Sequence, residues 1–386
     1  MALAEFNYGH GMRALWPLED GALYLNHGTV GVTPVEVLAA QWEIKQTIEA
    51  HPARFMRCRL KPGLRAAADR VAAHLGGDGD DYVFTDNATT GTNAVLRSMD
   101  LGPGDEILVT DHTYGAVANA ARYACEKAGA TLVTVDIPFP IAHDDEAAAA
   151  IESGLSPDTR LAILDHVTSE TGILLPLQRL VALCHDAGTR VLVDGAHAPG
   201  TVDLDIPSYG AEWYSANLHK WLFAPRGCGV LWADPRVQED LHPAVISWRL
   251  GEGYTEEFDW TGTRDPSPFL SVPAALDFFD KIGGGLVAAH NHALAGAAAR
   301  MFADRFGGQT GAPEGMISAM GLAPLPERLD ASLDQAVTLR DHLARKHNIE
   351  VPIIPRSGRL WARLAAQVYC QMSDYEILAD AIDAYP

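Results

Sequence analysis

Short apolar runs alternate with longer helical patterns between Tyr82 and Asp234. Seven runs have the length and composition of buried strands: Tyr82–Thr85, Glu106–Thr110, Thr131–Ile137, Leu161–His166, Arg190–Asp194, Trp213–Ala216 and Gly229–Ala233. Helix candidates lie between the early runs, at Gly91–Ser98, Ala116–Ala128, Ala147–Gly154 and Leu177–Ala187. This alternation is typical of a mostly parallel sheet covered by helices. It predicts an α/β fold with a seven-stranded sheet, in which ligands bind at the carboxyl ends of the strands.

The pattern changes after Trp260, where the turn-rich segment Thr261–Pro268 ends the alternation. The rest of the chain has a helical region from Val272 to about Arg305, a helix at Leu333–His347, strand candidates at Glu350–Ile354 and Leu360–Ala366, and a final helix at Asp374–Tyr385. We therefore expect three parts: an N-terminal arm at residues 1–25, a large domain at residues 26–268 and a smaller α+β domain at residues 269–386.

Composition narrows the classes of function. The formal charge is −21, and no basic face or run is visible, which argues against a nucleic-acid partner or an anionic membrane. No stretch approaches the roughly 18 apolar residues of a spanning helix, and the N-terminus lacks the apolar core of a signal peptide. The five cysteines are scattered, without a CxxC pair, at Cys58, Cys125, Cys184, Cys228 and Cys370. They predict free thiols in a reducing cytoplasm and no zinc site.

A lysine and an aspartate stand at the ends of two predicted strands. Asp194 ends the run Arg190–Asp194, and Lys220 follows the run Trp213–Ala216, 26 residues later. This pair is the minimum needed to hold pyridoxal 5'-phosphate (PLP). The lysine forms a Schiff base with the aldehyde, and the aspartate keeps the pyridine nitrogen protonated so that the ring can accept electrons.

A candidate phosphate cradle appears in the right chain order. The segment Asp86–Asn93, which includes Thr89 and Thr90, follows the first strand and opens a helix. Its small residues let the backbone approach an anion, while first-turn amides and hydroxyls can bind it. By itself such a cluster is typical of an ordinary helix cap, and it gains weight from Asp194 and Lys220.

Three further segments follow strand ends. In Asp111–Tyr114, the rings of His112 and Tyr114 could stack on the cofactor, or simply pack in a loop. In Asp165–Gly172, a hydroxyl could bind the phenolic oxygen, or the segment is a turn and cap. His197, three residues after Asp194, could contact the cofactor or substrate, or be an ordinary interior histidine.

Five segments carry a resemblance to a known family: Tyr24–Gly28, Asn87–Gly91, Asp194–His197, Asn217–Trp221 and Trp260–Asp265. They resemble class V aminotransferase-fold enzymes, and most of all the isopenicillin N epimerase-like branch, which is related to cysteine desulfurases and to the sulfoxide lyases of ergothioneine synthesis. The resemblance runs from about Leu23 to the C-terminus. It implies fold type I of the PLP-dependent transferases and the PLP cofactor, and it is poorly specific for the substrate.

The resemblance also implies roles for individual residues. Lys220 would carry the cofactor and Asp194 would pair with its ring nitrogen. Ala88 and Thr89, joined by Asn217 and His219, would hold the phosphate, with Thr90 in the same segment. Thr263 would reach the phosphate of the neighbouring subunit, so the active unit would be a homodimer with shared sites. His112 or Tyr114 would stack on the ring, Ser169 would lie near the phenolic oxygen, His197 would lie beside the cofactor, and Arg363 would bind the substrate α-carboxylate.

One departure from the family concerns a cysteine. Cysteine desulfurases carry a nucleophilic cysteine on a loop that precedes the C-terminal strands, and the matching stretch, Ala312–Met320, has none. Persulfide-forming desulfurase activity is therefore not expected.

The chemistry is expected at the α-carbon of an amino acid, with Lys220 removing the α-proton. Return of a proton from the opposite face gives an epimerase or racemase, which the resemblance places first, with His112, Tyr114 and His197 as candidate second proton carriers. Expulsion of a sulfur group from the β-carbon gives a C–S lyase, a near second. Transamination and a non-catalytic PLP-binding module are the remaining alternatives.

Overall fold

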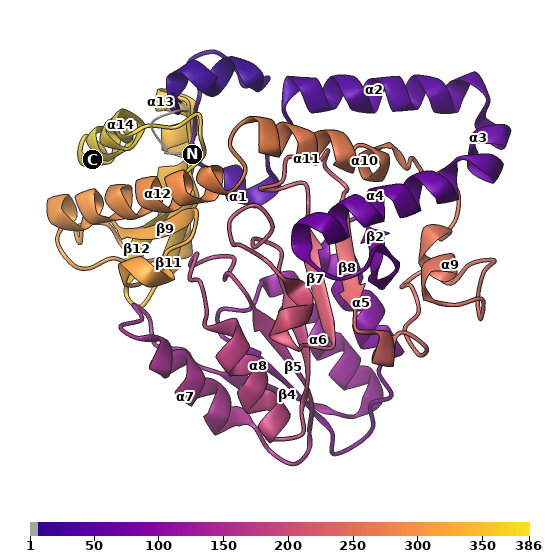
Figure 1. Ribbon diagram of the computed structural model, residues 1–386. Helices are drawn as coiled ribbons and strands as arrows, with labels where there is room; N and C mark the ends of the chain where they lie inside the picture. The colour runs from indigo at the N-terminus through magenta and orange to yellow at the C-terminus, as the bar shows by residue number, and fades with distance from the viewer. Residues whose placement is uncertain (1–6) are drawn as a thin grey trace.

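The computed structural model describes residues 7–386 (Figure 1). A seven-stranded sheet forms its centre. Its strands are β2 (Tyr82–Thr85), β3 (Glu106–Thr110), β4 (Thr131–Val135), β5 (Thr159–Asp165), β6 (Arg190–Asp194), β7 (Trp213–Asn217) and β8 (Gly229–Ala233). The order is β2-β8-β7-β6-β5-β3-β4. β8 pairs antiparallel with both β2 and β7, and all the other pairs are parallel. The predicted mostly parallel seven-stranded sheet is confirmed.

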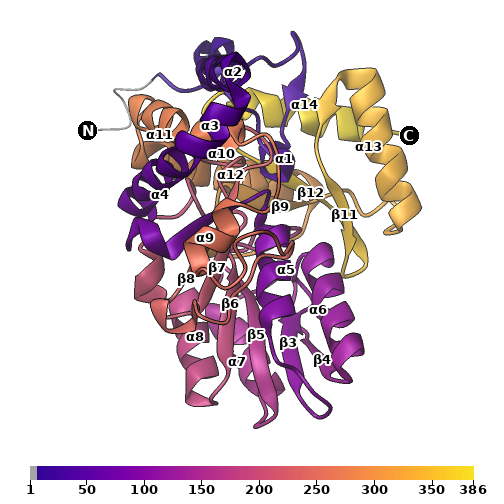
Figure 2. The ribbon, with the colours of Figure 1, turned by 90° about the vertical axis from the view of Figure 1, so that its right-hand side faces the viewer.

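The two faces of this sheet follow from the alternation of side chains along each strand. Ile107 and Val109 of β3 share one core with helices α5 (Ala88–Ser98) and α6 (Gly115–Ala128). Leu108 points the other way, into the core that contains α7 (Asp144–Gly154) and α8 (Leu177–Asp186). Figure 2 shows α5 and α6 together on one side of the strands and α8 on the other. Because both faces are covered, the strands are apolar on both sides.

Helices that the sequence analysis did not assign precede and follow this sheet. They are α2 (Val35–Ala50), α3 (Pro52–Cys58), α4 (Leu60–Leu75), α9 (Tyr254–Asp259) and α10 (Ser267–Leu270), with short 3₁₀ turns at His10–Leu15, Gly79–Asp81, Ile206–Tyr209, Pro235–Val237 and Glu314–Met316. In α4, the buried side chains of Leu64, Ala68 and Val71 fall at helical spacing and form the face that packs on the core.

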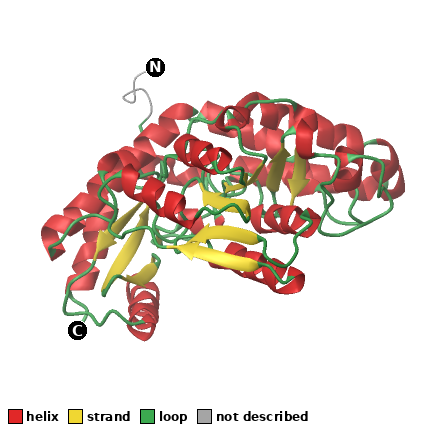
Figure 3. Ribbon diagram, turned by 90° about the horizontal axis from the view of Figure 1, so that it is seen from below, coloured by secondary structure: helices red, strands yellow, loops and turns green. Residues whose placement is uncertain are grey.

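The C-terminal part has its own three-stranded sheet, seen apart from the larger one in Figure 3. Its elements are α11 (Val272–Lys281), α12 (Gly285–Phe306), β9 (Met320–Pro324), α13 (Leu333–His347), β10 (Ile349–Glu350), β11 (Ile353–Arg356), β12 (Arg359–Ala365) and α14 (Met372–Asp383). The helical region from Val272 is two helices because Gly283 and Gly284 have positive φ. The strand expected at Glu350–Ile354 is divided, since β10 pairs with β1 and β11 pairs with β12. The boundaries proposed for the three parts of the chain stay a prediction.

The two ends of the chain meet. β1 (Leu23–Tyr24) pairs in parallel with β10, and the Leu25 carbonyl accepts a hydrogen bond of 3.2 Å from the Ala365 amide. Figure 1 shows the indigo N-terminal segment beside the yellow C-terminal elements. Residues 1–6 of the predicted arm lie outside the described residues. Within residues 7–386, no helix is both long and apolar enough to cross a membrane.

Candidate active site

A cavity of about 400 Å³ lies at the carboxyl ends of the parallel strands. Ten of the predicted site residues line it: Ala88, Thr89, Tyr114, Ser169, Asp194, His197, Asn217, His219, Lys220 and Arg363. The C-terminal β11 and β12 complete the wall, since Ile354 and Arg363 belong to these strands. The structure therefore gathers residues that are as far as 335 positions apart in the sequence, Gly28 and Arg363, around one space.

Lys220 is buried, and its ammonium group has lost most of its hydration. Burial lowers the pKa of Lys220 from 10.5 to about 7, while Asp194 opposes that shift. The Nζ atom lies 3.0 Å from Nε2 of His197, and the indole N–H of Trp221 donates to Nδ1 of the same ring at 3.5 Å. An imidazole whose Nδ1 accepts carries its proton on Nε2, so His197 donates to an uncharged Lys220 amine. A neutral amine is the form that attacks an aldehyde.

Asp194 ends β6 and is 3% exposed. One carboxylate oxygen accepts the Ala196 amide at 3.0 Å. Burial raises the pKa of Asp194, and the Ala196 hydrogen bond and Lys220 act in the opposite direction. A carboxylate in such a place offsets the cost of burying a cationic ring nitrogen.

The start of α5 is attached to the end of β7. Asn217 Oδ1 accepts the Ala88 amide at 2.9 Å, and the Ser215 hydroxyl donates to the Ala88 carbonyl at 2.9 Å. Asn87 caps the helix by accepting from the Thr90 amide at 2.9 Å. The Thr89 amide and hydroxyl have no hydrogen-bond partner among the described residues, which leaves them for an anion at the helix N-terminus.

His219 faces the same end of the cavity. Its Nδ1 lies 2.8 Å from the Cys228 carbonyl, so this nitrogen carries a proton and Nε2 is the nitrogen left for a ligand. Burial lowers the pKa of His219 to about 4. A nearby phosphate would favour the protonated ring, because an opposite charge stabilises the charged form.

Helix α1 (His27–Val30) and the following Gly31 pack directly on His219 and Lys220. Gly31 has φ +67°, and a Cβ there would lie 2.0 Å from the His219 carbonyl oxygen. His27, buried in α1, has Nε2 2.9 Å from the Lys220 carbonyl. The close approach of Gly31 to the His219 carbonyl needs glycine. Together with the His27 contact, it fixes the backbone of Lys220.

Arg363 on β12 is buried, and residues at the start of the chain, Asn26 and Thr29 of the α1 region, bind its side chain. One terminal nitrogen donates to Thr29 Oγ1 at 2.7 Å and to Asn26 Oδ1 at 3.3 Å, and the other donates to the Ser169 carbonyl. Its buried Nε has no partner among the described residues. Burial lowers the pKa of Arg363 to about 10, so the guanidinium remains charged at neutral pH.

Two rings predicted to stack on the cofactor have different positions. Tyr114, 43% exposed, lines the cavity. His112 is buried outside the cavity lining, with Nδ1 2.7 Å from the Thr171 hydroxyl and Nε2 3.2 Å from the Ile137 carbonyl. Of the two rings, Tyr114 is the one that lines the cavity, and which ring stacks on the cofactor stays a prediction.

Two other predicted residues also lie outside the lining of this cavity. The Thr90 hydroxyl is 3.2 Å from Asn87 Oδ1, within the helix cap. Thr263 is exposed on the segment that follows α9. Its expected role at the neighbouring subunit's site stays a prediction.

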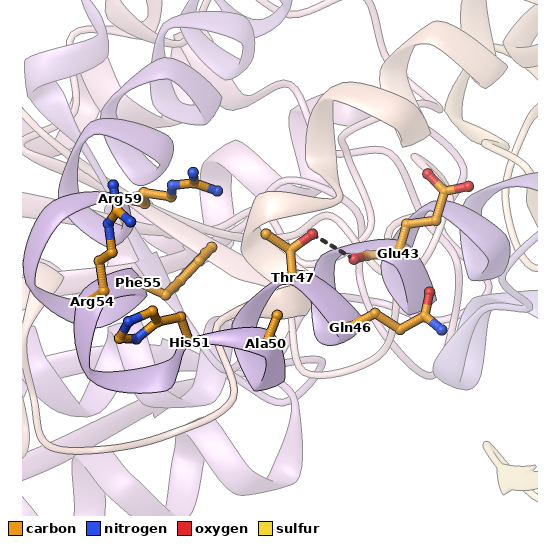
Figure 4. A pocket seen from close by; sticks show the side chains of 8 residues that line it. All are labelled: Glu43, Gln46, Thr47, Ala50, His51, Arg54, Phe55 and Arg59. Atoms are coloured by element: carbon orange, nitrogen blue, oxygen red, sulfur yellow. Dashed lines mark hydrogen bonds between the residues drawn. The ribbon is translucent and has the colours of Figure 1, made fainter.

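A separate surface depression of about 480 Å³ lies along α2 and α3 (Figure 4). Its lining includes the basic side chains of Arg54 and Arg59 and the ring of His51. None of its residues lines the Lys220 cavity, and it has no lysine or aspartate in its wall. The chemistry predicted from the sequence therefore belongs to the cavity at the strand ends.

None of the five cysteines lines the Lys220 cavity, and Cys125, Cys184, Cys228 and Cys370 are buried. No cluster of His, Cys, Asp or Glu within residues 7–386 is arranged to hold a metal ion.

Several lining residues were not assigned a role from the sequence: Gly28, Thr29, Asp165, Val167, Glu170, Pro352 and Ile354. Asp165 could have been found from the sequence, because it follows the apolar run Leu161–Leu164 and a carboxylate in such a place is rarely buried without a reason. The others belong to the short helix α1, to loops and to β11, whose approach depends on tertiary packing.

A parallel sheet with a buried lysine and aspartate at its strand ends is the arrangement of a PLP-dependent enzyme. Residues 27–311 match the family model for class V aminotransferases, and the chain belongs to this family. It is 32% identical to an L-cysteine desulfhydrase of Arabidopsis thaliana, over 94% of this chain and 88% of the relative. It is 30% identical to the isopenicillin N epimerase of Streptomyces clavuligerus, over 100% and 99% of the two chains.

A solved structure of C-DES with glycine covalently linked to its PLP cofactor has the same fold. The TM-score is 0.83 at 22% identity, covering 97% of this chain and 99% of that one. The cofactor of the family is therefore PLP. The residues present fit it, because a neutral lysine amine, a buried carboxylate and the unpartnered donors of Thr89 and Arg363 face one cavity.

Proposed function

We propose that this enzyme is a C–S β-lyase that releases sulfide or a thiol from cysteine or a cysteine conjugate. One observation supports this choice: Lys220 lines the cavity, and burial lowers the pKa of its amine to about 7, so it can accept a proton near neutral pH. Of the three expected second carriers, His112 lies outside the cavity lining and His197 is hydrogen-bonded to Lys220 itself. β-Elimination needs a single proton carrier, whereas epimerisation needs one on each face of the α-carbon.

PLP, when bound, withdraws electrons from the substrate α-carbon through its protonated ring. Asp194 holds the proton on the ring nitrogen, and Arg363 orients the substrate through its α-carboxylate. Lys220 Nζ removes the α-proton and returns it to the departing sulfur. Burial favours the uncharged form of the free Lys220 amine, and His197 Nε2 lies 3.0 Å from it.

Two further findings support a lyase. Relatives named L-cysteine desulfhydrase occur at 32–33% identity, and the C-DES fold relative is described as a cystine C–S lyase. Because no cysteine lines the cavity, a protein thiol is not available there to accept the sulfur. Sulfur would then leave as free sulfide or as a thiol.

The test is a product assay on the PLP-loaded protein. We expect cysteine and water to give pyruvate, ammonia and hydrogen sulfide in equal amounts, with S-substituted cysteines giving the matching thiol. A loaded protein that forms none of these products, yet inverts an amino acid in deuterated water with one α-deuterium gained, would reject the lyase.

Epimerisation is the second candidate, and one residue favours it. Tyr114 lines the cavity, and its hydroxyl could carry the second proton. The relative named isopenicillin N epimerase matches the whole chain. Under the lyase proposal Tyr114→Phe retains ring stacking and elimination, whereas an epimerase would lose turnover on the order of 10²–10⁴-fold.

Arg363 supplies a separate prediction about substrate binding. Arg363→Lys should raise the KM for the amino acid roughly ten- to hundredfold, because a charge-assisted hydrogen bond contributes about 1.5–3 kcal/mol and lysine lacks the planar fork. The matched control is Arg345→Lys, an exposed position on α13. Equal KM values for the wild type and Arg363→Lys would contradict the assignment.

We propose a homodimer with shared sites. Thr263 is exposed, and the preceding segment exposes Val245, Ile246, Trp248 and Leu250, with Trp248 91% exposed. A second copy of the chain would cover these apolar side chains and receive Thr263 at its phosphate end. A monomer mass by sedimentation of the loaded protein would contradict this.

A cytoplasmic location stays a proposal, since a relative at 33% identity is named as chloroplastic.

A further inference from the structure

A second carboxyl group lies beside Asp194. Asp165 and Asp194 end the adjacent parallel strands β5 and β6 and are paired in register. Alternation along the strands places both side chains on the α5/α6 face, opposite Leu164 and Val193. Both line the Lys220 cavity, and they are 1% and 3% exposed.

Hydrogen bonds distinguish the two groups. Asp194 accepts the Ala196 amide at 3.0 Å and is attracted by Lys220, both of which favour its charged form. Asp165 has Oδ2 buried with no hydrogen-bond partner among the described residues, and the Thr113 hydroxyl is the side chain that bonds its carboxyl group. Among the described residues, the charged group that acts on Asp165 is Asp194.

Two adjacent buried carboxylates cannot both remain ionised at low cost, so one of them keeps a proton. Burial and the neighbouring Asp194 charge together raise the pKa of Asp165 well above its usual range. The hydrogen bonds place the negative charge on Asp194 and the proton on Asp165.

We propose that Asp165 is a protonated carboxylic acid whose hydroxyl donates to Asp194, so that the pair presents a single negative charge to the cofactor's ring nitrogen. Asp165 is thus a positioning residue: it acts on the ring through Asp194. The single negative charge shared by the two carboxyl groups holds the proton on the ring nitrogen. A second buried negative charge would repel the cofactor phosphate, and removing it from water would cost free energy. The inference rests on PLP as the cofactor and does not depend on which reaction follows.

The first test is infrared spectroscopy of the protein at neutral pH, with and without PLP. We expect the carbonyl band of a protonated carboxyl group in the wild type and in the control Asp145→Asn, which alters an exposed carboxylate. Asp165→Asn should lack this band. A wild type without this band, or a band of equal strength in Asp165→Asn, would show that Asp165 is ionised and overturn the proposal.

The second test compares two replacements by PLP affinity, measured by equilibrium dialysis. Asp165→Asn keeps a neutral donor of the same shape, so its affinity should stay within about threefold of the wild type. Asp165→Leu removes the donor and should weaken binding roughly tenfold or more. If Asn weakens binding as much as Leu, the neutral-donor role is excluded. Neither measurement depends on turnover. The two tests therefore decide the state of Asp165 even if the enzyme proves not to be a lyase.

Discussion

Replacing Lys220 with alanine should abolish covalent attachment of PLP and lower turnover by at least about 10³-fold, since both the attachment point and the proton carrier are lost. The loaded wild type should absorb at the edge of the visible range and become permanently labelled after borohydride reduction. Lys220→Ala should show neither property. The matched control, Lys127→Ala, alters an exposed lysine on α6 and should behave as the wild type.

The same lysine predicts a pH dependence. Attachment requires the uncharged amine, and burial lowers the pKa of Lys220 to about 7. When PLP is added to the cofactor-free protein, the rate of attachment should rise with pH and level off above about 7. A lysine with an ordinary pKa would keep gaining reactivity to above about 10. A covalent label on Lys220→Ala, or a rate that continues to rise, would contradict the assignment.

The second large effect is expected from Asp194→Asn. The amide cannot hold the positive charge on the ring nitrogen, so turnover should fall on the order of a thousandfold through the lost electrostatic stabilisation. Lys220 remains in place, so the covalent chromophore and borohydride labelling should persist. Retained chromophore with lost turnover therefore distinguishes Asp194→Asn from Lys220→Ala.

The control for this substitution is Asp186→Asn at the exposed end of α8, which should change neither property. Loss of the chromophore in Asp194→Asn would mean that Asp194 is needed for binding as well. Full activity in that variant would show that another group holds the ring nitrogen.

The central sheet could be predicted from the sequence because its strands are apolar on both faces and their lengths differ from those of the intervening helices. Lys220 and Asp194 could also be found, since Asp194 ends one strand, Lys220 follows another, and the carboxyl ends of parallel strands lie together at one edge of a sheet. β9 was missed because the run Met320–Pro324 contains a glycine and a proline and lacks β-branched residues. Helices α2–α4 were not assigned, although the buried side chains of α4 have helical spacing.

The detailed placement of the site required the structure. His112 and Tyr114 are two residues apart and look equivalent as stacking rings, but hydrogen bonds to Thr171 and the Ile137 carbonyl hold His112 away from the cavity. Glu170 and Ile354 line the same cavity from a loop and a strand nearly 200 residues apart. These contacts depend on how the C-terminal sheet packs against the large sheet. Local sequence patterns do not predict that packing.

The pairing of β1 with β10 and the grip of Asn26 and Thr29 on Arg363 have a consequence for biosynthesis. During translation, the segments that carry Asp194 and Lys220 emerge long before Arg363 does. A chain still attached to the ribosome can therefore display the lysine without the anchor for the amino-acid carboxylate. Substrate recognition becomes possible only after the last strand has left the exit tunnel and returned to the first residues made.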